Sequence, residues 1–259
     1  MGGKRRIFGR ILRLAGIAAI FLAATCCMEM SVPKAERVSV TVRLSETDAL
    51  VRSGDNVEMT DICLLVFNQD GTAEKCIYPH KGTTALDLAL ISGKTYSFYA
   101  LAGFGYRVYA THISEMQELT FHIDNPRDLR TQIPMSGHAD EITISSETSV
   151  RIPMKRLAAR ISIEMDRSRI DEDVIMEVTG IRIGNCPNQA KAFGRSRVNK
   201  SEDCFTHGYS LYGPEVSLLN IADSSGHSGR ISLFMLENMQ GKLSDIQPDE
   251  DRDKVGTVI

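Results

Sequence analysis

The chain has 259 residues, a net charge of −3 at neutral pH, six histidines and no tryptophan. Its acidic and basic residues are interspersed, which excludes the basic patch that nucleic-acid-binding proteins carry, so we expect no nucleic-acid partner. Beyond the N-terminal segment, roughly 230 residues remain, which suits one large domain or two small ones.

Residues 1–27 have the features of an export signal. Basic residues precede an apolar run from Leu14 to Ala24, which is shorter than the ~20 residues that a membrane-spanning helix needs. Small residues then lead to Cys26 and Cys27, as in a bacterial lipobox. We expect one of these cysteines to be acylated and the lipid to tether the chain to a membrane. An ordinary cleaved signal with incidental cysteines is the alternative. Residues 28–36 are then a linker.

Period-2 alternation of apolar and polar residues dominates the rest of the chain and predicts strands. The first strand is half-buried, and its apolar residues are Val38, Val40, Val42 and Leu44. Residues 61–67 are apolar on both faces, as in an inner strand of a sandwich, and Asn68–Gly71 predicts a hairpin turn after them. A four-residue turn places Cys63 opposite Cys76, whereas a two-residue turn shifts the register by two. In the first register a disulfide between them is possible only with adjustment of the backbone, and we expect two buried free thiols instead.

Further strands, and a hairpin, follow the same pattern. The repeated Ile-Pro-Met at 133–135 and 152–154 suggests that residues 141–145 and 149–154 form a hairpin turning at Ser146–Glu147. Its prolines would stand at or outside the rim, because proline cannot donate to a strand ladder. The remaining predicted strands are 95–105, 161–165, 174–178 and 181–183 with a bulge at Gly180, 215–221 and 230–236; short helices are predicted at 45–51 and 167–174.

Five segments in this order carry a resemblance to a known family. They are "MTDICLLVFNQDG" (59–71), "TYSFYALAGFG" (95–105), "IPMSG" (133–137), "VRIPMKRLAARISIEM" (150–165) and "LFMLENMQG" (233–241). Together they resemble the fimbrillin-like proteins of the Bacteroidia, which are lipoprotein-derived subunits of surface pili, and the match covers most of residues 38–241.

The resemblance implies an all-β fold of two transthyretin-like, Greek-key β-sandwich domains. The first would span residues 37–155 and the second residues 156–241. More strands usually follow "ENMQG" in the family, whereas here residues 242–259 form a charged tail. We therefore expect either that the second domain is incomplete or that this is a truncated member of the family, with the tail exposed or disordered.

The resemblance also implies a function: a structural or anchoring subunit of a fimbrium at the outer membrane, with other fimbrial subunits as partners. In such proteins, cleavage after an arginine removes the first strand, and a neighbouring subunit fills the groove by strand complementation. Here Val38, Val40, Val42 and Leu44 would form that strand. Arg52 lies in the following loop and is the best-placed arginine, whereas Arg43 lies inside the strand and Arg37 before it. Anchor-type members keep their lipid and are not cleaved, so shaft, tip and anchor roles all stay open.

Catalytic and metal-binding motifs are missing from the sequence. It has neither H-E-x-x-H nor Cys-x-x-Cys, and "GHSGR" (226–230) lacks the Gly-x-Ser-x-Gly pattern of a nucleophile elbow. We therefore expect no enzyme activity, metal or cofactor. The rival interpretation is a surface-tethered β-sandwich that binds glycans or other host or bacterial surface ligands, and such a protein should expose an aromatic platform.

Overall fold

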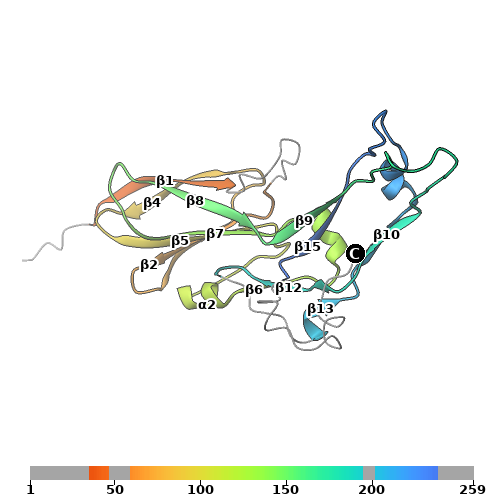
Figure 1. The fold of residues 1–259 in the computed structure, drawn as a ribbon. Coiled ribbons are helices and arrows are strands. Elements are labelled where there is room, and N and C mark those ends of the chain that lie inside the picture. Colours follow the sequence, from red (N-terminus) through yellow and green to blue (C-terminus); the bar gives the residue numbers. More distant parts are fainter. Residues whose placement is uncertain (1–34, 47–58, 195–201, 239–259) are drawn as a thin grey trace, which may run out of the picture. The chain divides into compact units, whose positions relative to one another are not determined.

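The alternating residues near the N-terminus form strand β1 (Arg37–Glu46), as predicted. The computed structural model describes residues 35–46, 59–194 and 202–238, and most of its elements are strands (Figure 1). Cys26, Cys27 and Arg52 lie outside these residues. The chain divides into an N-terminal unit, Met1–Glu36, and a second unit that begins at Arg37. A division of the second unit into domains 37–155 and 156–241 stays a prediction.

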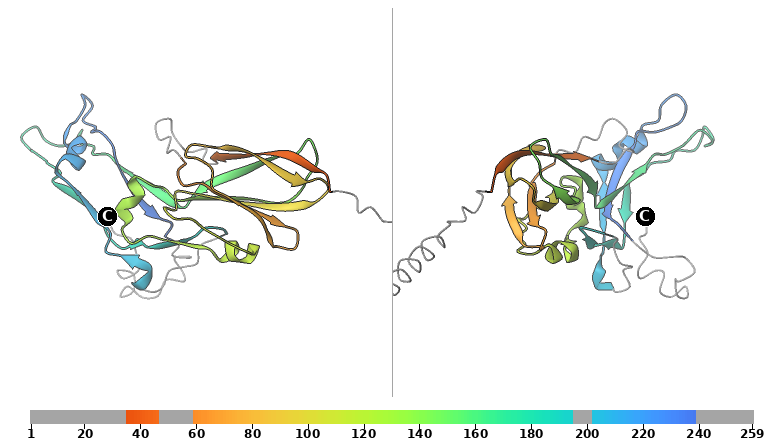
Figure 2. Two further views of the ribbon diagram at one scale, coloured as in Figure 1. Left: turned by 180° about the vertical axis from the view of Figure 1, so that it is seen from behind. Right: turned by 90° about the vertical axis from the view of Figure 1, so that its left-hand side faces the viewer.

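A seven-stranded sheet in the order β3-β2-β5-β7-β8-β1-β4 forms the first half of this second unit. Between β7 and β8 the ladder is short, with Met135 opposite Arg156 and Ser136 opposite Lys155. The sheet bends there, so that β4, β1 and β8 face β2, β5 and β7 as two layers (Figures 1 and 2). The other strands of this sheet are β2 (Cys63–Asn68), β3 (Ala73–Ile77), β4 (Ala85–Ile91), β5 (Thr95–Ala102), β7 (Met135–Thr143) and β8 (Ser149–Arg156).

The first hydrophobic core lies between the two layers. Strands β1, β2, β4, β5 and β8 contribute every second residue to it, as the pleat requires. Its buried members include Val40 and Val42 of β1, Ile152 and Met154 of β8, and Phe98 of β5. Two sandwiched layers around one such core are the all-β architecture that the sequence predicted.

A second core covers the opposite face of β2 and β5. Cys63 and Leu65 point into it, so β2 is buried on both faces and the prediction of an inner strand is confirmed. The covering segment contains helix α2, which the sequence analysis missed although His112 and Glu115 form a capping box at its start. The elements on this side are α2 (Ile113–Glu118), β6 (Thr120–His122), the 3-10 helix η1 (Pro126–Arg130) and β12 (Gln189–Lys191).

Short two-stranded pairs form the rest of the described chain, and all of them except β6–β12, which belongs to the second core, lie around a third core. That core contains Ile183, Leu211 and Leu233 among its buried residues. The pairs are β9 (Ala158–Ile163) with β15 (Ile231–Leu236), β10 (Gly180–Ile183) with β14 (Tyr209–Tyr212), β11 (Cys186–Pro187) with β13 (Phe205–Thr206), and β12 with β6; the 3-10 helices η2 (Glu202–Cys204) and η3 (Gly213–Asn220) complete the elements.

The predicted hairpin around Ser146–Glu147 is wrong. Strand β7 pairs mainly with β5, and β8 pairs mainly with β1, because the two strands belong to opposite layers. Pro134 precedes β7 as expected, but Pro153 lies inside β8, where no β7 residue pairs with it. The two backbones come close at this point, since a Cβ on Gly137 would lie 2.3 Å from the Pro153 carbonyl oxygen.

Three local predictions in the second half also fail. Residues 215–220 lie in η3 instead of a strand, because Gly213-Pro214 starts a helical turn and Val216 and Leu219, three residues apart, are its buried residues. Residues 174–178 form no strand, and β10 begins at Gly180 without a bulge. Residues 167–174 form turns instead of a helix.

Candidate functional site

Strand β1 occupies an inner position in the seven-stranded sheet. It pairs antiparallel with β4, from Arg37 opposite Ile91 to Arg43 opposite Ala85, and parallel with β8, where Glu46 lies opposite Met154. We call the position between β4 and β8 the β1 slot. Because β1 has a neighbour on each side, its removal would leave unpaired backbone groups along both β4 and β8.

The inward-facing row of β1 closes the first core. Val40 and Val42 are fully buried, Leu44 is nearly so, and Val38 is half-buried. Burial of each such side chain contributes about 1.5–3 kcal/mol. The predicted apolar set is therefore assembled on one face, and a vacated slot would expose a strip of apolar surface.

Polar contacts also join the outward side of β1 to each of its two neighbours. The Thr41 hydroxyl donates to Asp87 Oδ1 of β4 at 2.6 Å. On the other side, Arg151 Nε of β8 donates to the Ser45 hydroxyl at 2.9 Å. These contacts lie at the surface, so they orient the strand more than they stabilise it.

An ion pair marks the C-terminal end of the slot. Glu46 pairs with Arg156 of β8, and the side chains are 26% and 11% exposed. Sequence analysis missed both residues. Each follows an inward apolar row at the same period of two and their charges are opposite, but the pairing of β1 with β8 that brings them together could not be read from the sequence. Sequence analysis also missed β4, whose Leu86, Leu88 and Leu90 alternate in the same way.

The predicted processing residues are only partly described. Arg37 and Arg43 both have exposed side chains on β1, but Arg43 lies within both ladders, which withholds its backbone from a protease. Arg52, Cys26 and Cys27 lie outside the described residues. The structure therefore brings Val38, Val40, Val42 and Leu44 together. It does not test the lipidation and cleavage sites, which stay predictions.

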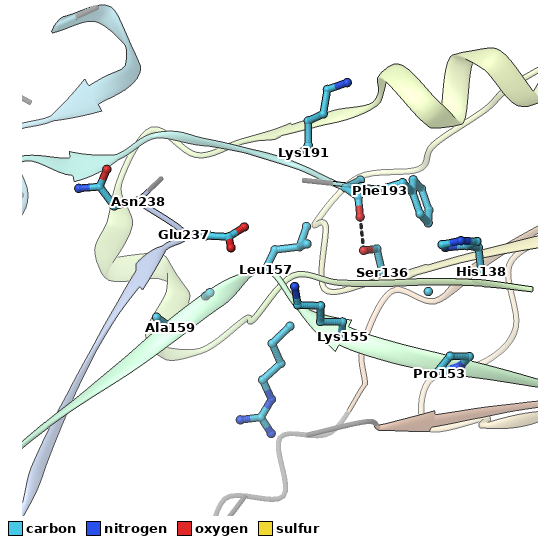
Figure 3. A pocket seen from close by; sticks show the side chains of 15 residues that line it. Ser136, His138, Pro153, Lys155, Leu157, Ala159, Lys191, Phe193, Glu237 and Asn238 are labelled. Carbon is cyan, nitrogen blue, oxygen red and sulfur yellow. Dashed lines mark hydrogen bonds between the residues drawn. The ribbon is translucent and has the colours of Figure 1, made fainter. Parts of the chain in front are cut away.

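A cavity of about 800 Å³ opens beside the same end of β8 (Figure 3). Its lining contains the basic residues Lys155, Arg156 and Lys191 and the acidic residue Glu237. Lys191 pairs with Glu118 at 3.0 Å. The lining thus combines apolar and polar side chains, and its basic groups outnumber its acidic ones near the Glu46–Arg156 pair.

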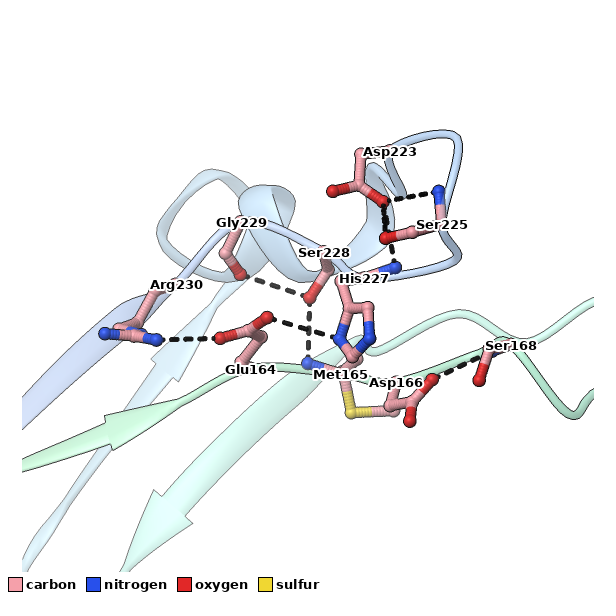
Figure 4. A network of polar contacts seen from close by, with 10 residues as sticks. All are labelled: Glu164, Met165, Asp166, Ser168, Asp223, Ser225, His227, Ser228, Gly229 and Arg230. Atoms are coloured by element: carbon pink, nitrogen blue, oxygen red, sulfur yellow. Dashed lines mark hydrogen bonds and ion pairs between the residues drawn. The ribbon is translucent and has the colours of Figure 1, made fainter.

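The "GHSGR" loop is held by structural contacts (Figure 4). Ser228 accepts a hydrogen bond from the Met165 amide at 2.8 Å and donates to the Gly229 carbonyl. His227 and Arg230 both contact Glu164, at 3.4 and 2.9 Å. These contacts tie the loop to the chain after β9. No group of three metal-ligating side chains is found in residues 35–46, 59–194 and 202–238.

An exposed aromatic cluster combines Tyr78, which follows β3, with residues of the loop after β5. Tyr109 is 67% exposed, and its ring packs edge-on against that of Tyr78, with 5.6 Å between ring centroids. The Arg107 guanidinium carbon lies 4.9 Å from the Tyr78 centroid. The Tyr78 hydroxyl donates to the Val108 carbonyl at 2.7 Å, and its removal from solvent raises the pKa of Tyr78, so it stays a neutral donor.

Helices long and apolar enough to cross a membrane do not occur in the described part of the chain. The sequence matches no protein-family model and no curated protein.

Comparison with solved structures shows the fold. The chain is similar to a candidate cell adhesion protein from Bacteroides eggerthii, with a TM-score of 0.51, 13% identity, and coverage of 79% of this chain and 72% of the other. It is also similar to a fimbrial assembly protein from Parabacteroides distasonis, with a TM-score of 0.47, 13% identity, and coverage of 78% of this chain and 77% of the other. A fimbrilin from Porphyromonas gingivalis gives a TM-score of 0.48, 13% identity, and 77% and 80% coverage. The first of these shares its β-sandwich fold with this chain.

Proposed function

We propose that this chain is a structural or anchoring subunit of a bacterial surface fimbrium that assembles by β-strand complementation and acts without catalysis. The observation that carries the proposal is the inner position of β1. Because β1 has a neighbouring strand on each side, its departure exposes the backbone groups of β4 and β8 and one face of the first core. An extended segment of another subunit can restore the backbone pairing and cover the core at the same time. The fold shared with a candidate cell adhesion protein from Bacteroides eggerthii supports a surface role.

In the proposed mechanism, cleavage in the segment that follows β1 releases the strand. Arg52 is the proposed cleavage site, because Arg43 is held within both ladders. The neighbouring subunit would then contribute a strand whose apolar residues take the places of Val40, Val42 and Leu44. Export as a lipoprotein through Cys26 or Cys27 would place the chain on the outer membrane. An anchor subunit would keep both its lipid and β1.

The experiment that tests this function compares the purified full chain before and after cleavage by a trypsin-like protease. We expect the intact chain to stay monomeric, and the chain cleaved at Arg52 to form polymers visible by electron microscopy. Arg52→Gln is the control, and it should block both cleavage and polymer formation. Cleavage at Arg52 that yields only monomers would contradict a shaft role.

A second candidate function rests on the aromatic cluster of Tyr78, Arg107 and Tyr109. An exposed tyrosine ring beside a guanidinium group can stack on a sugar ring and donate hydrogen bonds to its hydroxyls. The chain would then be a surface-tethered adhesin. Binding to immobilised neutral polysaccharides distinguishes the two, since Tyr109→Ala should abolish binding by an adhesin. Tyr212→Ala is the matched control, because Tyr212 is 64% exposed elsewhere on the chain.

A further inference from the structure

The inward row of β1 does not end with an apolar residue. Residues 40, 42 and 44 are buried and apolar, and the next residue of the same parity is Glu46. The inward row of β8 follows the same rule, because Val150, Ile152 and Met154 lead to Arg156. In the parallel ladder Glu46 lies opposite Met154, so the next inward residue of β8 is Arg156, and the two side chains pair.

The surroundings of Arg156 favour a carboxylate at the position of Glu46 over an apolar or basic side chain. Its guanidinium group stays charged at every physiological pH, and its side chain is only 11% exposed. Removing one partner of a largely buried charge costs more than removing one of an exposed pair. The adjacent cavity is lined by Lys155 and Lys191 as well, with Glu237 as its acidic group (Figure 3). An apolar or basic side chain at the position of Glu46 would therefore be unfavourable.

We propose that Arg156 selects the strand that replaces β1, and that this strand carries a carboxylate in the register of Glu46. The partner is an extended segment with three inward apolar residues at a period of two, followed two residues later by Asp or Glu. The apolar row provides most of the affinity, and the carboxylate fixes the register, since a shift by two residues would bring an apolar side chain to Arg156. This inference rests on the proposed strand complementation.

The test uses the full chain with a site-specific protease sequence inserted after Arg52, so that β1 can be cut free whether or not Arg52 is cleaved naturally. After cleavage, verified by mass spectrometry, two fluorescent peptides compete for the β1 slot. One has the sequence of residues 37–46 with a C-terminal amide, and the other is identical except for glutamine in place of Glu46. We expect the glutamine peptide to bind at least about tenfold more weakly.

Two variants of the chain assign the preference. Arg156→Met should bind both peptides equally, and Arg156→Lys should retain part of the preference. Arg151→Met is the matched control, since Arg151 lies on the same strand and contacts Ser45 on the outward side; it should keep the full preference.

The outcomes separate this inference from the proposed function. Equal binding of both peptides to the unsubstituted chain would overturn the role of Arg156 and leave strand complementation standing. If Arg156→Met still preferred the glutamate peptide, the role of Arg156 would be overturned as well, and strand complementation would again stand. Binding of neither peptide would overturn both. The peptide comparison uses the unsubstituted chain, so it stands even if an Arg156 variant fails to fold.

Discussion

Leu65, and not Cys63, lies opposite Cys76 in the β2–β3 hairpin. The register differs by two residues from the one that a four-residue turn gives, and a shift between Val66 and Phe67 accompanies it. Cys63 and Cys76 are therefore diagonal neighbours, which lie ~7–8 Å apart at Cα, whereas the Cα atoms of a disulfide usually lie ~4.4–6.8 Å apart. Both thiols are free, and only Cys63 is buried, so the expectation of two buried thiols is wrong for Cys76.

The two thiols should react differently. Burial raises the pKa of Cys63 to about 12, so its reactive thiolate is scarce at pH 8. We expect iodoacetamide to alkylate Cys76 in the native protein and Cys63 only after denaturation, as read by peptide mass spectrometry. A peptide pair linked through Cys63 and Cys76 under non-reducing conditions would refute this arrangement.

How much the sequence could predict depended on the kind of element. Strand β1 was predictable because one of its faces is buried, so alternation maps directly onto burial. The segment 215–221 was misread because short apolar runs fit a strand and a helical turn equally well, and the Gly-Pro at its start was not weighed. The separation of β7 from β8 was not readable, since the pairing partners of both strands lie far away in the sequence. The Glu46–Arg156 pair was not readable for the same reason: parity and charge mark each residue as the end of an inward row, but the pairing of β1 with β8 joins them across a long stretch of sequence.

Leu44 provides a direct measure of what β1 contributes to stability. Leu44→Ala removes a nearly buried side chain from the first core and should lower the free energy of unfolding by about 2–4 kcal/mol. Arg43→Ala, on the exposed side of the same strand, should change it by less than about 0.5 kcal/mol. Urea denaturation measures both. A Leu44→Ala variant as stable as the unsubstituted chain would show that β1 does not close the core.

Glu215 predicts an acid-dependent loss of stability. Hydrogen bonds from Arg127 and Arg130 hold the pKa of this carboxyl at about 2, below its ordinary value of 4.5. The folded-state pKa is depressed, so the stabilisation is fully present above pH 4.5 and is lost as the pH falls towards 2. Glu215→Gln should therefore lower the urea midpoint at pH 7, and the gap to the unsubstituted chain should close by pH 2. A gap independent of pH would exclude the ion pairs as its cause.

Lipidation at the N-terminus predicts how the precursor fractionates. The full chain expressed in a bacterium that acylates lipoproteins should be recovered with the membranes. Changing Cys26→Ser and Cys27→Ser together should move it to the soluble fraction, because the tether is lost. Each single variant identifies which cysteine is acylated. A double variant that stays with the membranes would exclude a lipid anchor at these positions.

The central claim is that the β1 slot accepts a strand from outside the chain. Deleting residues 38–44 should leave the chain poorly soluble, because the faces once covered by Val40, Val42 and Leu44 become exposed. A peptide of residues 37–46 should restore a soluble monomer, and the same peptide with proline in place of Val42 should not, since proline cannot join the ladder. Sedimentation velocity with and without each peptide measures this. Rescue by the first peptide alone is the predicted result, whereas a deletion variant that stays a soluble monomer and binds neither peptide would contradict strand complementation.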